Sequence, residues 1–209
     1  MVAPILLFAV GNESRGDDAL GILLLRELID WLTPNRKTVS ELPAQLQRAG
    51  DDFEMIEDYQ LQVEHAMDMR DRRLVLFIDA GIGTHAPFAF YRAQPINESV
   101  LYSHSLAPEI LLNVYKQFYR EIPPDVFILC IRGESFELGE GLSDDAAAHL
   151  ATAIEFARGC YRYLKWRHGT SCAYVTQSRT TSLASIVFHY RWPVYFHIYF
   201  HIRSYGNTD

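Results

Sequence analysis

The 209-residue sequence has few cysteines and a shortage of positive charge. Its three cysteines, Cys130, Cys160 and Cys172, form no CxxC pair and no even disulfide framework, which is typical of a protein in a reducing compartment. Lys and Arg number 19 against 26 Asp and Glu, so the formal net charge is −7. Phosphate contacts need clustered Lys and Arg, and this balance therefore argues against nucleic-acid binding. A basic partner or a metal cation stays possible.

Long apolar runs are also absent. No run approaches the roughly 20 residues that span a bilayer, and the N-terminus lacks the basic region and small-residue cleavage site of a signal peptide. We therefore expect a cytoplasmic protein without membrane contact. The hydrophobic fraction of 49% and the charged fraction of 22% are ordinary for a globular protein. The length suits one α/β domain, alone or with a tail.

Apolar runs of strand length alternate with helical patterns through most of the chain. The runs that predict strands lie at residues 4–10, 53–59, 74–78, 88–96 and 126–131. Helical spacing and capping signals predict helices at residues 17–31, 60–69 and 107–119, one helical turn at 44–48, and a long last helix after the N-cap Ser143. This alternation predicts a three-layer α/β/α fold with a mostly parallel, five-stranded twisted sheet.

The predicted domain comprises residues 1–167, and residues 168–209 form a C-terminal tail of uncertain structure. The tail begins with a polar, Ser/Thr-rich stretch and continues with aromatic, histidine and β-branched residues that fit no clear element. His197 and His201 have the i, i+4 spacing that binds a metal on a helix. Their β-branched and aromatic neighbours argue against a helix there, so we do not assign them a metal.

Three side chains that can bind a metal are expected at one edge of the sheet. Ligands of parallel α/β sheets bind outside the carboxyl ends of the strands. Asp17 and Asp18 open the helix after the first strand, Asp79 ends the run LVLFI, and His104 lies just before a helix. One cap does not require two acids, so we interpret Asp17 as the helix cap and Asp18 as the functional carboxylate.

Asp18, Asp79 and His104 would form an O,O,N ligand set with open positions. Such a set suits a divalent ion such as nickel or zinc. Each residue also has an ordinary structural interpretation, as a helix cap, a turn former or a surface histidine. Nucleotide binding is disfavoured, because Glu13 stands where the dinucleotide motif needs a glycine and two acids would repel a phosphate.

Several segments together resemble one family. GNESRGDDALG (residues 11–21) resembles the N-terminal signature of the hydrogenase maturation proteases, which process [NiFe]-hydrogenase large subunits. LVLFIDAG and SHSLAPEILL resemble the segments that carry the family's second acid and its histidine, and ESFELGEGLS resembles the loop before its last helix. The resemblance spans residues 3–165. EDYQLQVEHAMDM is most similar to members paired with bidirectional, NAD-linked hydrogenases, but a glycine-rich turn is missing there, which leaves the roles of Glu57 and Asp58 open.

The resemblance implies an endopeptidase that removes a C-terminal peptide from the nickel-loaded precursor of a hydrogenase large subunit. Asp18, Asp79 and His104 would be its catalytic and nickel-contacting residues, with the nickel supplied by the precursor. Two mechanisms stay open: the metal activates the carbonyl or a water, or a carboxylate acts as general base in an aspartic-type reaction. No Ser/His/Asp triad is evident, and Cys130 lies within a strand, which argues against a nucleophilic protease.

The same residues would also serve a non-catalytic nickel-binding assembly factor that holds the precursor. Such a protein differs from the endopeptidase in one observable respect, since the mass of the bound precursor would not change.

Removal of residues 168–209 is expected to leave a folded and active domain, because the tail has no counterpart in the resemblance. Thermal melting followed by circular dichroism, together with an assay of precursor cleavage, tests this. A truncated chain that fails to fold or to cleave would show that the tail belongs to the functional unit.

Overall fold

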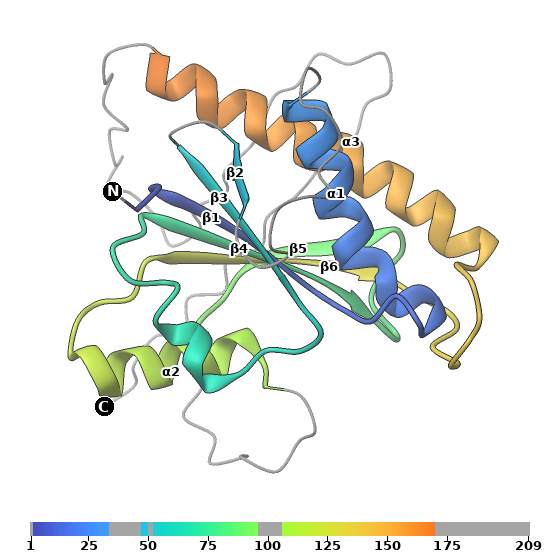
Figure 1. Cartoon of the computed structure of the whole chain (residues 1–209), viewed down its shortest axis with the longest axis horizontal. Coiled ribbons are helices and arrows are strands. Elements are labelled where there is room, and N and C mark those ends of the chain that lie inside the picture. Colours follow the sequence, from blue (N-terminus) through green and yellow to red (C-terminus); the bar gives the residue numbers. More distant parts are fainter. Residues whose placement is uncertain (1, 34–46, 50–51, 96–105, 170–209) are drawn as a thin grey trace, which may run out of the picture. The chain divides into compact units, whose positions relative to one another are not determined.

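The computed structural model describes residues 2–33, 47–49, 52–95 and 106–169. Six strands form one sheet in the order β2-β3-β1-β4-β6-β5 (Figure 1). Their bounds are Ile5–Val10 for β1, Gln47–Ala49 for β2, Phe53–Asp58 for β3, Leu74–Gly81 for β4, Phe88–Arg92 for β5 and Asp125–Arg132 for β6.

The sheet is mostly parallel, as predicted. Strands β3, β1, β4 and β6 run parallel to one another, whereas β2 and β5 lie antiparallel at the two edges. All five predicted strands are present, and β2 is an additional strand of three residues. The helical turn expected at residues 44–48 is wrong for Gln47 and Arg48, because these residues pair with the open edge of β3. Pairing with a neighbouring strand outweighs a weak local helical preference.

Helices follow the predicted positions with two differences. The helices are α1 (Leu20–Leu32), α2 (Pro108–Tyr119) and α3 (Asp144–Gly169), with 3-10 turns η1 (Gly16–Ala19) and η3 (Val63–Ala66). The first helix therefore begins as a 3-10 turn, and the helix expected at residues 60–69 is reduced to η3. The Ser143 hydroxyl accepts the N–H of Ala146 at 3.3 Å, which confirms its predicted role as N-cap of α3.

The three layers follow from the complete burial of β1 on both faces. One set of alternate β1 side chains packs in a core with α1 and α3, and the other set packs in a core with α2 and η3. Figure 1 shows α1 and α3 on one side of the sheet and α2 on the other. The predicted three-layer α/β/α fold is thereby confirmed. None of the described helices combines the length and the apolar character that crossing a membrane requires.

The division of the chain near residue 167 stays a prediction. Contacts group Met1–Lys165 as one compact unit and Trp166–Asp209 as a second. Residues 170–209, including His197 and His201, lie outside the described residues.

Gly21 determines how closely α1 approaches the sheet. A Cβ atom at this position would lie 2.5 Å from the carbonyl oxygen of Val10 and 2.6 Å from that of Ile78. Only a residue without a side chain lets the helix rest on the backbones of β1 and β4. Asp18 lies three residues before Gly21, and Asp79 directly follows Ile78, so this contact brings both acids to the same end of the sheet.

Gly21→Ala is expected to lower the free energy of unfolding by about 3 kcal/mol, because the added methyl group meets strand backbone that cannot move away. Gly159→Ala is a matched control, since its added Cβ has no atom within 4 Å. An alanine in that helical position should stabilise the protein by about 0.5–1 kcal/mol. Urea denaturation measures both, and equal effects at the two positions would contradict the close contact at Gly21.

Candidate functional site

Asp18 and Asp79 lie together at the carboxyl ends of the central strands. Asp18 belongs to η1, directly after the turn that leaves β1, and Asp79 lies near the end of β4. Phe77 packs in the α2-side core and Ile78 in the opposite core, so the alternation of the strand places Asp79 on the α2 side. The Asp18 charge lies near enough to Asp79 to contribute to the raised pKa of that carboxyl group.

Both carboxyl groups bind protons more readily than an ordinary aspartate does. Burial raises the pKa of Asp79 to about 7; the nearby Asp18 charge adds to this, while the Ala80 N–H, which donates at 2.7 Å, opposes it. Burial also raises the pKa of Asp18, against the influence of Arg15 and of a backbone hydrogen bond. Two acids that repel each other in a partly desolvated place favour either a proton or a cation between them.

The predicted imidazole, His104, lies outside the described residues. Within the part of the chain that the structure describes, no three His, Cys, Asp or Glu side chains form a group that could hold a metal ion. The described site therefore contains two of the three predicted ligands. Helix α2, which begins at Pro108 shortly after His104 in the sequence, packs on the same face of the sheet as Asp79.

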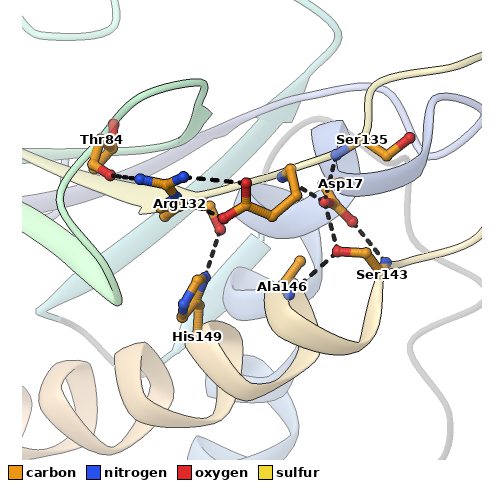
Figure 2. A network of polar contacts seen from close by, with 8 residues as sticks. Asp17, Thr84, Arg132, Ser135, Ser143, Ala146 and His149 are labelled. Carbon is orange, nitrogen blue, oxygen red and sulfur yellow. Dashed lines mark hydrogen bonds and ion pairs between the residues drawn. The ribbon is translucent and has the colours of Figure 1, made fainter.

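Asp17 does not cap its own helix, and that expectation is wrong. Its fully buried carboxylate accepts four hydrogen bonds from the segment after β6 (Figure 2). The donors are the N–H of Glu134 at 2.7 Å, the N–H of Ser135 at 2.9 Å, and the N–H and hydroxyl of Ser143 at 2.7 and 2.8 Å. Asp17 lies within the η1 turn rather than before it, and this turns the side chain towards the neighbouring loop.

The hydrogen bonds to Asp17 keep its carboxylate charged. Burial alone would raise the pKa of Asp17, but the bonds from Ser135, Ser143 and Glu134 outweigh it and hold the pKa below the ordinary value. A lowered folded-state pKa contributes stability above the unfolded pKa of about 4, and this contribution is lost as the pH falls through the folded value. Asp17 is therefore a structural anion at neutral pH.

The hydrogen bonds to Asp17 belong to a larger network of polar contacts around the end of β6 (Figure 2). Arg132, the last residue of β6, binds the Glu134 carboxylate through two N–H groups and donates to the Thr84 carbonyl at 3.1 Å. The Nδ1 atom of His149 lies 3.0 Å from the Arg132 carbonyl oxygen. Thr84 belongs to the turn between β4 and β5, and His149 to α3. The network therefore joins this turn, the loop after β6 and α3.

Glu57 and Asp58, whose roles the sequence left open, lie on opposite faces of the sheet. Glu57 accepts two hydrogen bonds from the Arg26 guanidinium, at 3.0 and 3.1 Å, on the side of α1. Asp58 lies on the α2 side with Asp79, because it alternates with Ile56, which packs in the α2-side core. Asp58 is therefore the one of these two acids that shares a face with Asp79.

His65 contacts Asp58, and the sequence reasoning missed this histidine. Its Nε2 atom lies 3.3 Å from the Asp58 carboxylate, and its Nδ1 atom accepts the Gln62 N–H at 2.9 Å. A neutral ring that accepts at Nδ1 carries its proton on Nε2, which then points to Asp58. The ring also packs against Phe8, with 4.7 Å between centroids. The sequence offers no spacing pattern that would connect His65 with Asp58.

Cys130 lies beside Asp79 on the neighbouring strand β6. It is half-buried, and its sulfur lies 3.1 Å from the Thr84 hydroxyl oxygen. Burial raises the pKa of the Cys130 thiol. Because the thiolate is the nucleophilic form, a raised pKa makes Cys130 less reactive at neutral pH than an ordinary cysteine.

Comparison with known proteins identifies the fold. No family model and no curated protein matches the chain. Among solved structures, the hydrogenase maturating endopeptidase HybD from E. coli is 23% identical over 77% of this chain and 93% of that one, with a TM-score of 0.53. The [NiFe] hydrogenase maturation protease HybD from Thermococcus kodakarensis is 18% identical over 75% and 97%, with a TM-score of 0.51. The chain therefore has the fold of solved hydrogenase maturation endopeptidases, as its motifs predicted.

Asp79→Asn is expected to stabilise the protein at pH 8. A folded-state pKa of about 7, above the unfolded value, means that stability falls as the pH rises from about 4 to about 7. At pH 8 the wild-type protein holds an ionised, partly desolvated carboxylate that asparagine lacks. Calorimetry should show a higher melting temperature for the variant at pH 8 and a smaller difference at pH 5. Asp30→Asn, at an exposed acid of α1, is the control; a pH-independent difference for Asp79→Asn would contradict the raised pKa.

Proposed function

We propose that the protein is an endopeptidase that removes a C-terminal peptide from the precursor of a [NiFe]-hydrogenase large subunit. The observation that carries this proposal is the pair Asp18 and Asp79, held at the strand ends of a fold shared with solved hydrogenase maturation endopeptidases. A fold alone hosts many functions. The pair adds chemistry, because two neighbouring carboxyl groups with raised pKa values cost stability and are typical of functional sites.

Nickel is the part of the substrate that Asp18 and Asp79 would recognise. In this proposal the ion arrives bound to the precursor, and Asp18, Asp79 and His104 contact its open face. Carboxylate oxygens and an imidazole suit a divalent ion of intermediate softness. A divalent cation would remove the repulsion between Asp18 and Asp79, whereas a nickel-free precursor would leave it in place. Loading of the precursor would thereby become the condition for productive binding.

Two routes to hydrolysis use these residues. In a metal-dependent route, the ion polarises the scissile carbonyl or activates a water. In an aspartic-type route, a carboxylate takes the proton from the attacking water while the ion serves for docking. A pKa of about 7 suits Asp79 for proton exchange near neutral pH. The free thiols of Cys130 and Cys160 support a cytoplasmic location, and EDYQLQVEHAMDM supports a bidirectional, NAD-linked hydrogenase as the partner.

Incubation with a nickel-loaded precursor should release a C-terminal peptide that intact-mass spectrometry detects, and a nickel-free precursor should stay intact. Asp18→Ala, Asp79→Ala and His104→Ala should each slow cleavage by about 100-fold or more, since each removes a group that contacts the reacting centre. Asp30→Asn, at an exposed acid far along α1, is the matched control and should cleave at the wild-type rate.

Three other outcomes would each contradict a different part of the proposal. A stable complex with an unchanged precursor mass would overturn the endopeptidase and favour the nickel-binding assembly factor. Equal cleavage of loaded and nickel-free precursor would overturn the role of nickel in recognition. A precursor that is neither cleaved nor bound would overturn the proposed partner.

A further inference from the structure

The loop between β6 and α3, residues 133–143, owes its shape to Asp17. The loop contains no helix or strand. Its first part reaches the Asp17 carboxylate through the N–H groups of Glu134 and Ser135, and its end reaches the same carboxylate through Ser143 (Figure 2). The buried Asp17 carboxylate thus holds the start and the end of the loop together.

The same loop is bonded on both sides to the backbone that carries the two acids. Three backbone–backbone hydrogen bonds join it to residues 14–17, just before Asp18: Gly139 N–H to the Ser14 carbonyl at 2.7 Å, Gly16 N–H to the Glu140 carbonyl at 3.2 Å, and Asp17 N–H to the Ser135 carbonyl at 2.8 Å. On the other side, the Gly133 N–H donates at 3.3 Å to the carbonyl of Gly81, two residues after Asp79. The loop is therefore fixed relative to both carboxylates.

Two large apolar side chains are exposed on the loop and on the turn after β4, which are joined by these hydrogen bonds. Leu138, within the loop, is 77% exposed, and Ile82, which directly follows Gly81, is 78% exposed. Arg132 ties the turn that contains Ile82 to the start of the loop through the Thr84 carbonyl. Neither side chain contributes to the two cores. Each lies instead on a segment that is held beside the carboxylate pair.

We propose that Leu138 and Ile82 are specificity-determining residues that contact an apolar side chain of the substrate near the scissile bond, and that Asp17 is the positioning residue that holds their segments. This rests on the proposed function and names the substrate class more closely, as an extended segment with an apolar residue next to the cleaved bond. Because the loop is already ordered, substrate binding would not have to supply the cost of ordering it.

Leu138→Gln and Ile82→Gln test the contact with side chains of similar size. Each should raise the KM for precursor cleavage by about tenfold, which corresponds to about 1.4 kcal/mol, and leave kcat within about twofold. Ile122→Gln is the matched control, because Ile122 is 92% exposed but precedes the start of β6, at the end of the parallel strands opposite to the two carboxylates. Its KM should equal that of the wild type. Equal KM values for Leu138→Gln, Ile82→Gln and the control would overturn the contact.

Asp17→Asn tests the positioning role. The variant places an amide N–H₂ group against N–H donors, so it should raise the KM and also open the loop to cleavage by chymotrypsin at Phe136 or Leu138. A purely structural role would lower the melting temperature and leave the KM and the protease pattern of the folded protein unchanged; that result would overturn the positioning role. If Asp17→Asn does not fold, Arg132→Met loosens the same segments from the other end and should raise the KM.

A failure of the proposed function is distinguishable in the same experiment. If the wild-type protein binds the precursor without cleaving it, the proposed endopeptidase activity is overturned. The contact of Leu138 and Ile82 with the substrate is then tested by the dissociation constants of the glutamine variants in place of their KM values. If the wild-type protein neither binds nor cleaves, both proposals are overturned.

Discussion

The close contact of α1 with the sheet is the constraint on which the site depends. Gly21 rests on the carbonyl oxygens of Val10 and Ile78, so the start of the helix lies directly over the ends of β1 and β4. Asp18 and Asp79 are both partly buried at this end of the sheet, and burial raises the pKa of each, with the Asp18 charge adding to the effect at Asp79. The arrangement opposes stability locally. The completely buried strand β1 and its two cores supply the compensating stability.

Asp17 and Asp18 show how neighbouring residues acquire opposite properties. The Asp17 carboxylate meets four donors and stays charged in a fully buried place, whereas burial makes Asp18 harder to ionise. The sequence shows two acids at the start of a helix and predicts a cap for the first of them. The donors that determine the actual role of Asp17 lie at least 117 residues further along the chain. Local patterns contain no information about such a pairing, which explains why the predicted cap was wrong.

The fold was predictable where burial leaves a simple pattern. Strand β1 is buried on both faces and therefore reads as an unbroken apolar run, and Pro108 and Ser143 mark the starts of α2 and α3. Strand β2 was not predictable, because three residues pair with an edge and leave no periodic signal. In the site, the position of Asp79 followed from the end of an apolar strand. The contact of His65 with Asp58 depends on how the chain turns after β3, and the residue types alone do not encode it.

The protonation of Asp79 affects how a site that recognises a metal ion would bind that ion. A pKa of about 7 means that a cation entering near neutral pH competes with a proton for this carboxylate. At pH 7 this competition lowers the affinity of the pair for a free ion by about twofold, because about half of the Asp79 side chains are protonated, and the loss grows as the pH falls. Weak intrinsic affinity is useful if the proposed substrate brings the ion with it. A site that bound free nickel tightly would be filled before the precursor arrived and would lose the difference between loaded and empty precursors. The raised pKa of Asp79 and the pH dependence of ion binding would then have one physical origin, the partial burial of this carboxyl group near Asp18.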